Sequence, residues 1–256
     1  MKKRLWVILT LVSVVLLLSG CTEFNEPISK ESEGFWNEFI VWPLVSAIKY
    51  FADLLGTYAW GIIVVTIIIR LAILPLMIKQ TKNAKKMQEM QPKMKELQAK
   101  YASKDAQTQQ QYQQEMMKLM KESGANPLAG CLPIFIQMPI LIGFYHAISR
   151  MNATAAFDLG NFFIFPLADP APVLAILAGL MQFIVLRTGP AMDNPQMKMM
   201  MYIMPFMIIG FGMALPAALS LYWVIGNIIS VLQNLFIYKP WKKNETEPAQ
   251  NGGAKK

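Results

Sequence analysis

The sequence predicts an all-α integral membrane protein with five transmembrane helices, a cytoplasmic helical hairpin and an outer amphipathic helix. The 256-residue chain is 54% hydrophobic with a mean hydropathy of +0.35, which is typical of membrane proteins. Long apolar runs alternate with polar segments, and about 20 apolar residues suffice to cross a bilayer. In a membrane protein, a formal charge of +8 indicates basic loops on the cytoplasmic side, and these loops suit contact with anionic lipid. No direct binding to nucleic acid is expected.

Residues 1–20 are predicted to be a signal peptide, because a basic start is followed by an apolar stretch from Leu5 to Leu18. This stretch ends in Leu18-Ser19-Gly20-Cys21, which resembles the bacterial lipobox. Cys21 is therefore expected to be lipidated and to form the mature N-terminus. The alternative is an ordinary signal or anchor sequence with an incidental cysteine. Both interpretations place the following residues outside the cell.

Residues 21–57 are predicted to form an outer segment with an interfacial amphipathic helix. The segment begins with several acidic residues, and from Phe35 to Leu55 apolar residues recur every three to five positions. Tryptophan and tyrosine are interleaved, as is common where a helix lies in the headgroup region. We expect this helix to be broken or entered at Pro43.

The first span, residues 58–78, contains a single charge, Arg70. Arg70 lies roughly 13 Å from Lys79 along a helix, so its side chain can cover only part of the distance to the polar sequence. An arginine at the centre of a span costs about 2.5–3.5 kcal/mol on insertion scales. Arg70 should therefore face water, a partner or the bundle interior. The alternative is that the span shifts and Arg70 reaches the cytoplasmic headgroups.

Residues 79–126 are predicted to form a cytoplasmic helical hairpin, because they are rich in lysine. Methionine, leucine and tyrosine recur every three or four residues on both sides of a polar turn near Lys104. Pro92 is expected to weaken or kink the first arm. The methionines serve either to pack one arm on the other or to contact varied apolar partners, and the two roles can coexist.

The remaining segments follow from the same alternation of apolar and basic sequence. Further spans are predicted at 131–149, 172–187, 199–215 and 217–238. They are connected by an outer loop at 150–171 and a cytoplasmic loop at 188–198, and the chain ends in a cytoplasmic tail at 239–256. The mature N-terminus is then outside and the C-terminus inside a bacterial plasma membrane.

Polar residues within the spans are candidates for a hydrated groove, since such groups must find partners or line water in hydrocarbon. From the residues alone, these candidates are Thr66, Arg70, Gln137, Gln182, Asn227 and Gln233. Each amide could instead join two helices by a hydrogen bond. Arg70 differs, because no acidic residue lies within any span to neutralise it. The pattern predicts a hydrated positive cavity that attracts acidic groups.

Enzymatic readings find little support. His146 is the only histidine and has no carboxylate or cysteine close in sequence, and no cluster has the spacing of metal ligands. Two cysteines, Cys21 and Cys131, are too few for a disulfide framework. We expect no catalytic residue, no metal and no cofactor. His146 is interpreted as a polar group near the outer end of its span, and Cys131 as a small apolar residue.

Two stretches, Asn126-Pro-Leu-Ala-Gly-Cys-Leu-Pro-Ile-Phe-Ile-Gln-Met-Pro-Ile140 and Leu221-Tyr-Trp-Val-Ile-Gly-Asn-Ile-Ile-Ser-Val-Leu-Gln233, closely resemble the YidC/Oxa/Alb family of membrane protein insertases. With the lipobox, Arg70 and the hairpin, the chain resembles the five-span, lipoprotein-type Gram-positive branch. The resemblance implies a hydrophilic groove open to cytoplasm and lipid. It assigns Arg70 to that groove, with Gln137, Gln182 and Trp223 as lining residues.

The resemblance also implies nascent membrane proteins as clients, with the ribosome and the Sec translocon as possible partners. The short tail implies weaker tethering to the ribosome than a long basic tail would give. Two other functions stay open. One is a small-solute transporter or channel, although no internal repeat is visible. The other is an assembly factor that only holds client helices.

Overall fold

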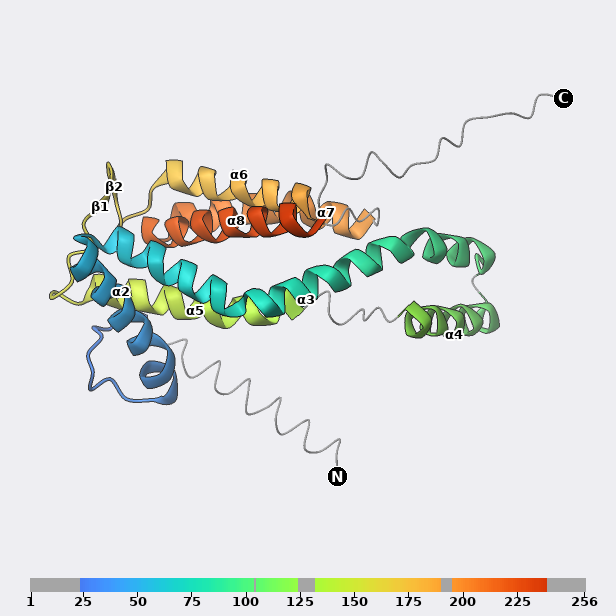
Figure 1. Cartoon of the computed structure of the whole chain (residues 1–256), viewed down its shortest axis with the longest axis horizontal. Helices are drawn as coiled ribbons and strands as arrows, with labels where there is room; N and C mark the ends of the chain where they lie inside the picture. The colour runs from blue at the N-terminus through green and yellow to red at the C-terminus, as the bar shows by residue number, and fades with distance from the viewer. Residues whose placement is uncertain (1–23, 104, 124–131, 190–194, 239–256) are drawn as a thin grey trace.

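The computed structural model describes residues 24–103, 105–123, 132–189 and 195–238 (Figure 1). The predicted signal peptide, Cys21, Cys131 and the tail lie outside these residues. In chain order the elements are η1 (Asn37–Val41), α2 (Trp42–Leu55), α3 (Tyr58–Lys100), α4 (Ala106–Ser123), α5 (Leu132–Ala153), β1 (Asn161–Phe162), β2 (Phe165–Pro166), α6 (Pro172–Thr188), α7 (Pro195–Ala214) and α8 (Ala217–Tyr238). The predicted helical fold is thus confirmed, with one small β-hairpin added between α5 and α6.

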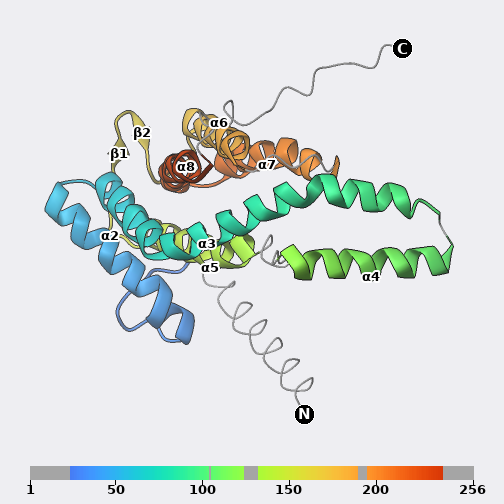
Figure 2. The same ribbon diagram turned by 45° about the vertical axis from the view of Figure 1, so that its right-hand side comes forward.

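Helix α8 lies between two groups of helices. It packs on α3 and on α6, and α6 in turn packs on α7. Figures 1 and 2 show α5 beside the first half of α3, and α6, α7 and α8 gathered together. Helix α4 runs back along the second half of α3, so this hairpin projects from one end of the bundle (the hairpin end). Helix α2 and the β-hairpin lie at the opposite end (the α2 end).

Helix α3 is continuous over 43 residues, or roughly 65 Å, so the predicted first span and the first arm of the predicted hairpin are one helix. Thr57 caps its start by accepting a hydrogen bond from the Trp60 backbone N–H at 3.4 Å. Pro75 and Pro92 lie inside the helix, where each removes a backbone hydrogen bond. The helix bends in both figures without being interrupted.

The predicted amphipathic helix is entered, not broken, near Pro43. The backbone winds through a π-helical turn at η1, in which the Trp42 N–H donates to the Asn37 carbonyl, and continues into α2. Pro43 falls in the first turn of α2, where its missing N–H costs little. One face of α2, with Val45, Ile48 and Ala52, is buried, whereas Tyr50 and Leu54 on the other face are exposed.

The turn between α3 and α4 is fixed by side chains. The Asp105 carboxylate accepts hydrogen bonds from the Thr108 N–H at 2.8 Å and the Ser103 hydroxyl at 2.5 Å, and these bonds hold the Asp105 pKa well below its usual range. The Tyr101 hydroxyl donates to Glu115 at 2.8 Å and lowers the pKa of that carboxyl. Met90 and Met116 are buried in the two arms, whereas Met117 is exposed, so the methionines provide packing and leave surface for other contacts.

A second buried arginine ties the start of the described chain to α5. The sequence places Arg150 at the edge of a loop, but it belongs to the last turns of α5 and is buried. Its guanidinium donates to the Asn37 side-chain oxygen at 2.6 Å and to the carbonyls of Glu26 and Pro27 at 3.0 and 3.1 Å. The Ile28 N–H also donates to the Thr154 hydroxyl at 2.8 Å. These bonds close the α2 end of the bundle.

Helices α2 and α3 approach closely at Gly61. A Cβ atom there would lie 2.4 Å from the Ile48 carbonyl oxygen and 3.2 Å from the Ala52 nitrogen. Both neighbours are backbone atoms, so they could move only if α2 moved as a unit. Small residues at such crossings are common in membrane proteins because they let helix backbones touch.

Gly61→Ala should therefore destabilise the fold by about 1–3 kcal/mol, the usual cost of overpacking. The measurement is thermal unfolding of the purified protein in detergent. Gly210→Ala is the matched control, because a Cβ at Gly210 of α7 meets no atom within 4 Å among the described residues. Equal melting temperatures for the two variants would contradict the close crossing.

Candidate groove between α3 and α8

Arg70 lies against the backbone of α8. A Cβ atom added at Gly226 would lie 2.5 Å from Arg70 Nη2 and 3.1 Å from both Cζ and Nε. The guanidinium thus occupies the space that any other residue at position 226 would fill. Gly226 is required here for its missing side chain, and it sets the depth at which the charge sits between the helices.

No hydrogen bond or ion pair to the Arg70 guanidinium occurs among the residues that the structure describes. Arg150 makes several such bonds at the α2 end, so the two arginines differ in how far the described residues satisfy their hydrogen-bond donors. An arginine has five donors in a planar fork that fits a carboxylate. Arg70 is only partly buried, so this fork is available to an incoming acceptor.

Polar groups from α5 and α8 surround the turn of α8 that precedes Gly226. Tyr222 is buried, and its hydroxyl accepts a hydrogen bond of 2.6 Å from the Gln137 amide of α5. The Tyr222 ring stacks on Phe144, with ring centroids 4.3 Å apart. Because Tyr222 and Gly226 are four residues apart, they lie on the same face of α8. Gln137 and Arg70 are therefore brought to one region through α8.

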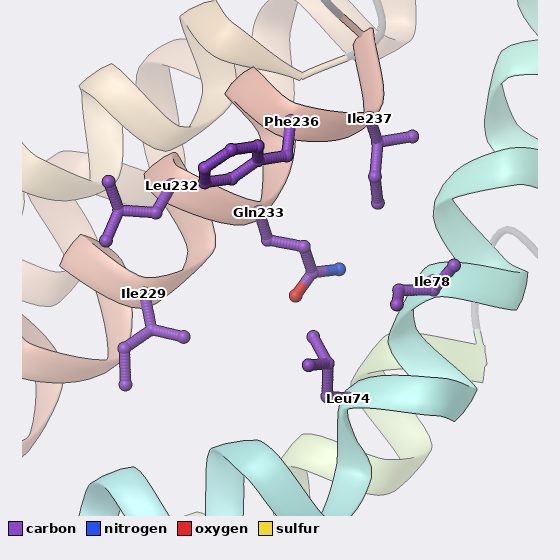
Figure 3. A pocket seen from close by; sticks show the side chains of 7 residues that line it. All are labelled: Leu74, Ile78, Ile229, Leu232, Gln233, Phe236 and Ile237. Atoms are coloured by element: carbon purple, nitrogen blue, oxygen red, sulfur yellow. The ribbon is translucent and has the colours of Figure 1, made fainter.

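Below this contact, on the side of the hairpin end, α3 and α8 leave a cavity of about 250 Å³. Its lining consists of Leu74, Ile78, Ile229, Leu232, Gln233, Phe236 and Ile237. Figure 3 shows the Gln233 side chain pointing from α8 into the gap between the helices. The Gln233 amide donates to the Thr81 hydroxyl of α3 at 3.3 Å. Leu74 lies one helical turn beyond Arg70, so the charge sits next to one end of the cavity.

The other residues predicted for the groove have different surroundings. Thr66 is fully buried and donates to the Ile62 carbonyl of its own helix at 2.7 Å. The Asn227 amide donates to the Ala178 carbonyl at 3.3 Å and so joins α8 to α6. Trp223 is 8% exposed and belongs to the core. Gln182 lies between α6 and α7, 3.6 Å from the Met204 sulfur.

Sequence reasoning missed Gly226, Tyr222 and the apolar walls of the cavity. The available signal was a glycine in a span that also carries amides, within the stretch Leu221–Gln233. The sequence does not show which apolar residues line a cavity, because that depends on the distance between α3 and α8. The cavity is apolar apart from Gln233, so the polar groups lie beside it more than within it.

This arrangement has the chemistry expected of a binding groove. It combines a cation that has no ion-pair partner within residues 24–103, 105–123, 132–189 and 195–238 with apolar walls, which suits an amphipathic chain segment with an acidic group. Two described helices, α3 and residues 217–237 of α8, are long and apolar enough to cross a membrane, and α6 and residues 201–214 are shorter apolar helices. The fold and site thus define an all-helical membrane protein with a partly buried arginine beside an apolar cavity.

Comparison with known proteins agrees with this class. Residues 50–245 match the family model described as 60Kd inner membrane protein. The chain is 49% identical to membrane protein insertase MisCA of Bacillus subtilis, covering 100% of this chain and 99% of the relative. It is 48% identical to membrane protein insertase YidC 2 of Bacillus anthracis, with 100% of both chains covered.

A crystal structure of an active YidC insertase, with its first transmembrane domain resolved, has the same fold at a TM-score of 0.59 and 26% identity. The match covers 78% of this chain and 46% of that chain, so this chain spans about half the length of the solved relative. The chain belongs to the 60Kd inner membrane protein family, the YidC/Oxa1 family. The resemblance inferred from the sequence is confirmed, as is the all-α membrane fold.

Gly226→Ala tests whether the groove depends on the position of the Arg70 charge. The fold should persist, because the added Cβ meets only the flexible end of a side chain. Insertion of a client with an acidic translocated tail, measured in proteoliposomes, should fall in the same direction as for Arg70→Ala but less. In an Arg70→Ala background, Gly226→Ala should have no further effect, because the contact is already gone. Additive losses would show that Gly226 acts independently of Arg70.

Proposed function

We propose that this membrane protein insertase accepts a client segment between α3 and α8, with Arg70 as the transient partner of acidic groups on the client. The observation that supports the proposal is the guanidinium against Gly226, beside a cavity and without a partner among the described residues. The clients are membrane proteins during their synthesis and insertion. Gln137, Tyr222 and Gln233 add polar contacts along the path, and Thr66, Gln182, Trp223 and Asn227 hold the helices around it.

The physical task is to move a polar tail across about 30 Å of hydrocarbon. A groove that reaches Arg70 shortens the apolar part of that path, and the positive charge offsets the cost of desolvating a carboxylate. The apolar walls accept the client helix, which then leaves into lipid. The membrane potential favours outward movement of negative charge by about 2.3 kcal/mol per charge per 100 mV. The proposal requires no covalent chemistry, no metal and no cofactor.

We further propose that the hairpin end is cytoplasmic and that the α2 end is outside, in a bacterial plasma membrane. Exposed lysines support this, since Lys79, Lys82, Lys85, Lys86 and Lys93 all lie on the second half of α3. The N-terminus is then outside, anchored by a lipidated Cys21, and the C-terminal tail is inside. The basic hairpin is suited to anionic lipids and to the ribosome, and the Sec translocon is a further possible partner.

A small-solute transporter or channel is the competing function. The described cavity opens between only two helices and its walls are apolar apart from Gln233, which favours a chain segment over a hydrated solute. Solute uptake and client insertion measured in the same proteoliposomes separate the two functions. The other alternative is an assembly factor that only holds clients, and loss of insertion in Arg70→Ala without loss of client binding would speak against it.

Arg70→Ala should reduce the insertion of clients with acidic tails by about ten- to hundredfold, since a hydrogen-bonded charge pair contributes roughly 1.5–3 kcal/mol. Arg70→Lys should retain most of the activity, because the charge remains. The measurement is protease protection of the client tail in proteoliposomes, with a client whose tail is uncharged as the control. If Arg70→Ala and Arg70→Lys failed equally, the geometry of the guanidinium would be needed and not only its charge. Full activity of Arg70→Ala would refute the proposal that Arg70 binds acidic groups of the client.

Lysines near the membrane should matter more than the tip of the hairpin. Lys93 lies roughly 21 Å beyond Lys79 along α3, about two Debye lengths at 0.1 M salt. Replacing Lys79, Lys82 and Lys86 by Gln should therefore weaken binding to anionic vesicles and reduce insertion. The same exchange at Lys93, Lys95 and Lys100 removes equal charge and is the matched control. Shortening the turn at 102–105 should have little effect on insertion. If that variant lost all insertion, the assignment of the contact region to the lysines near the membrane would be wrong.

A further inference from the structure

The β-hairpin between α5 and α6 presents two large apolar side chains at its tip. Phe163 is 84% exposed and Ile164 is 81% exposed, the highest values among the large hydrophobic residues of the described chain. Phe163 also adopts a φ of 55°, a left-handed conformation that usually selects glycine, asparagine or aspartate in tight hairpins. Neither the packing nor the turn explains why these positions are apolar.

The base of the hairpin is held firmly. Phe162 and Phe165 pack on the buried cluster of Ala171, Leu174 and Ala217, which belongs to the starts of α6 and α8. Backbone hydrogen bonds continue this attachment, with the Leu167 N–H donating to the Gly160 carbonyl at 2.9 Å and the Ala217 N–H donating to the Asp169 backbone carbonyl at 2.8 Å. The tip is therefore presented at a defined level, that of the first turn of α6.

In the membrane orientation proposed above, that level lies at the edge of the membrane. Helix α6 has 17 residues, or roughly 26 Å, which is shorter than the hydrocarbon core of about 30 Å. The first turn of α6 therefore lies no further out than the headgroup region, or the bilayer is locally thinned around α6. In both cases the β-hairpin that packs on this turn lies in the interface. The exposed apolar face of α6, with Val173, Ile176 and Leu177, starts beside the hairpin and continues away from it.

Charge and position indicate the same environment. Residues 161–168 carry no charged side chain, whereas Asp158 and Asp169 flank them and are exposed. Figures 1 and 2 show the hairpin beside α6 and α2 beside α3, both at the α2 end. Helix α2 exposes Tyr50, Leu54 and Leu55 there. Aromatic and aliphatic residues with polar flanks are typical of segments that lie in the interface.

We propose that Phe163 and Ile164 insert into the lipid of the leaflet at the α2 end and anchor that end of the bundle to the bilayer. The α2 end of the bundle then has two interfacial anchors, which are the β-hairpin beside α6 and helix α2 beside α3. The partner is the acyl and glycerol region of the lipid, because the tip is continuous with the lipid-facing surface of α6. A protein partner would be a different interaction, and the following experiment distinguishes it.

The test places an environment-sensitive fluorophore at the tip. With both native cysteines replaced by serine (Cys21→Ser and Cys131→Ser), Phe163→Cys and Ile164→Cys are labelled with a nitrobenzoxadiazole probe, and the full chain is reconstituted into vesicles of phosphatidylethanolamine and phosphatidylglycerol. Asp158→Cys, which is exposed in the same loop, is the matched control. Quenching is measured with nitroxide-labelled acyl chains and, separately, with aqueous iodide.

At positions 163 and 164, nitroxide lipids should quench strongly and iodide several-fold less than at position 158. Equal quenching by iodide at all three positions would overturn the proposal. Protection from iodide in native membranes but not in these vesicles would also overturn it and would indicate a protein partner. Labelling exposed tip positions leaves the core unchanged, and each variant is compared with the parent chain for thermal unfolding.

Discussion

The close contact between Arg70 and Gly226 is the constraint on which the groove depends. It lets the backbone of α8 approach α3 while a guanidinium remains between them, and below it the same two helices leave a cavity. A larger residue at position 226 would displace the charge, and an acid at that level would neutralise it. The site is therefore defined by a missing side chain as much as by a cation.

Helix α8 serves two purposes through different faces. Tyr222, Gly226 and Gln233 face α5 and α3, where they border the groove. Asn227 and Asn234 donate to the Ala178 and Val185 carbonyls of α6, at 3.3 and 3.1 Å, and so fix α8 to the other group of helices. Polar residues within one span thus divide between holding helices together and forming a site, which is consistent with the cost of leaving them unpaired in lipid.

The two buried or partly buried arginines show why residue type alone does not define a role. Arg150 is enclosed by the carbonyls of Glu26 and Pro27 and by Asn37, and it secures the first described residues to α5. Arg70 has neighbours that shape its position without bonding to it among the described residues. One arginine joins two parts of the fold, and the other keeps the hydrogen-bonding capacity that the proposed client contact requires.

The sequence by itself determined the helical membrane fold, because apolar length is a local property, and it determined the family through the stretches Asn126–Ile140 and Leu221–Gln233. Periodicity and an isolated charge, which are also local, led to the predictions of an amphipathic helix before the first span and of a role for Arg70. The sequence could not separate Gln137, beside the groove, from Gln182, between α6 and α7, since both are amides in apolar runs. Nor could it find Gly226, the cavity walls or the apolar tip at Phe163 and Ile164. Those features depend on which helix faces approach and where space remains, and only the tertiary structure decides that.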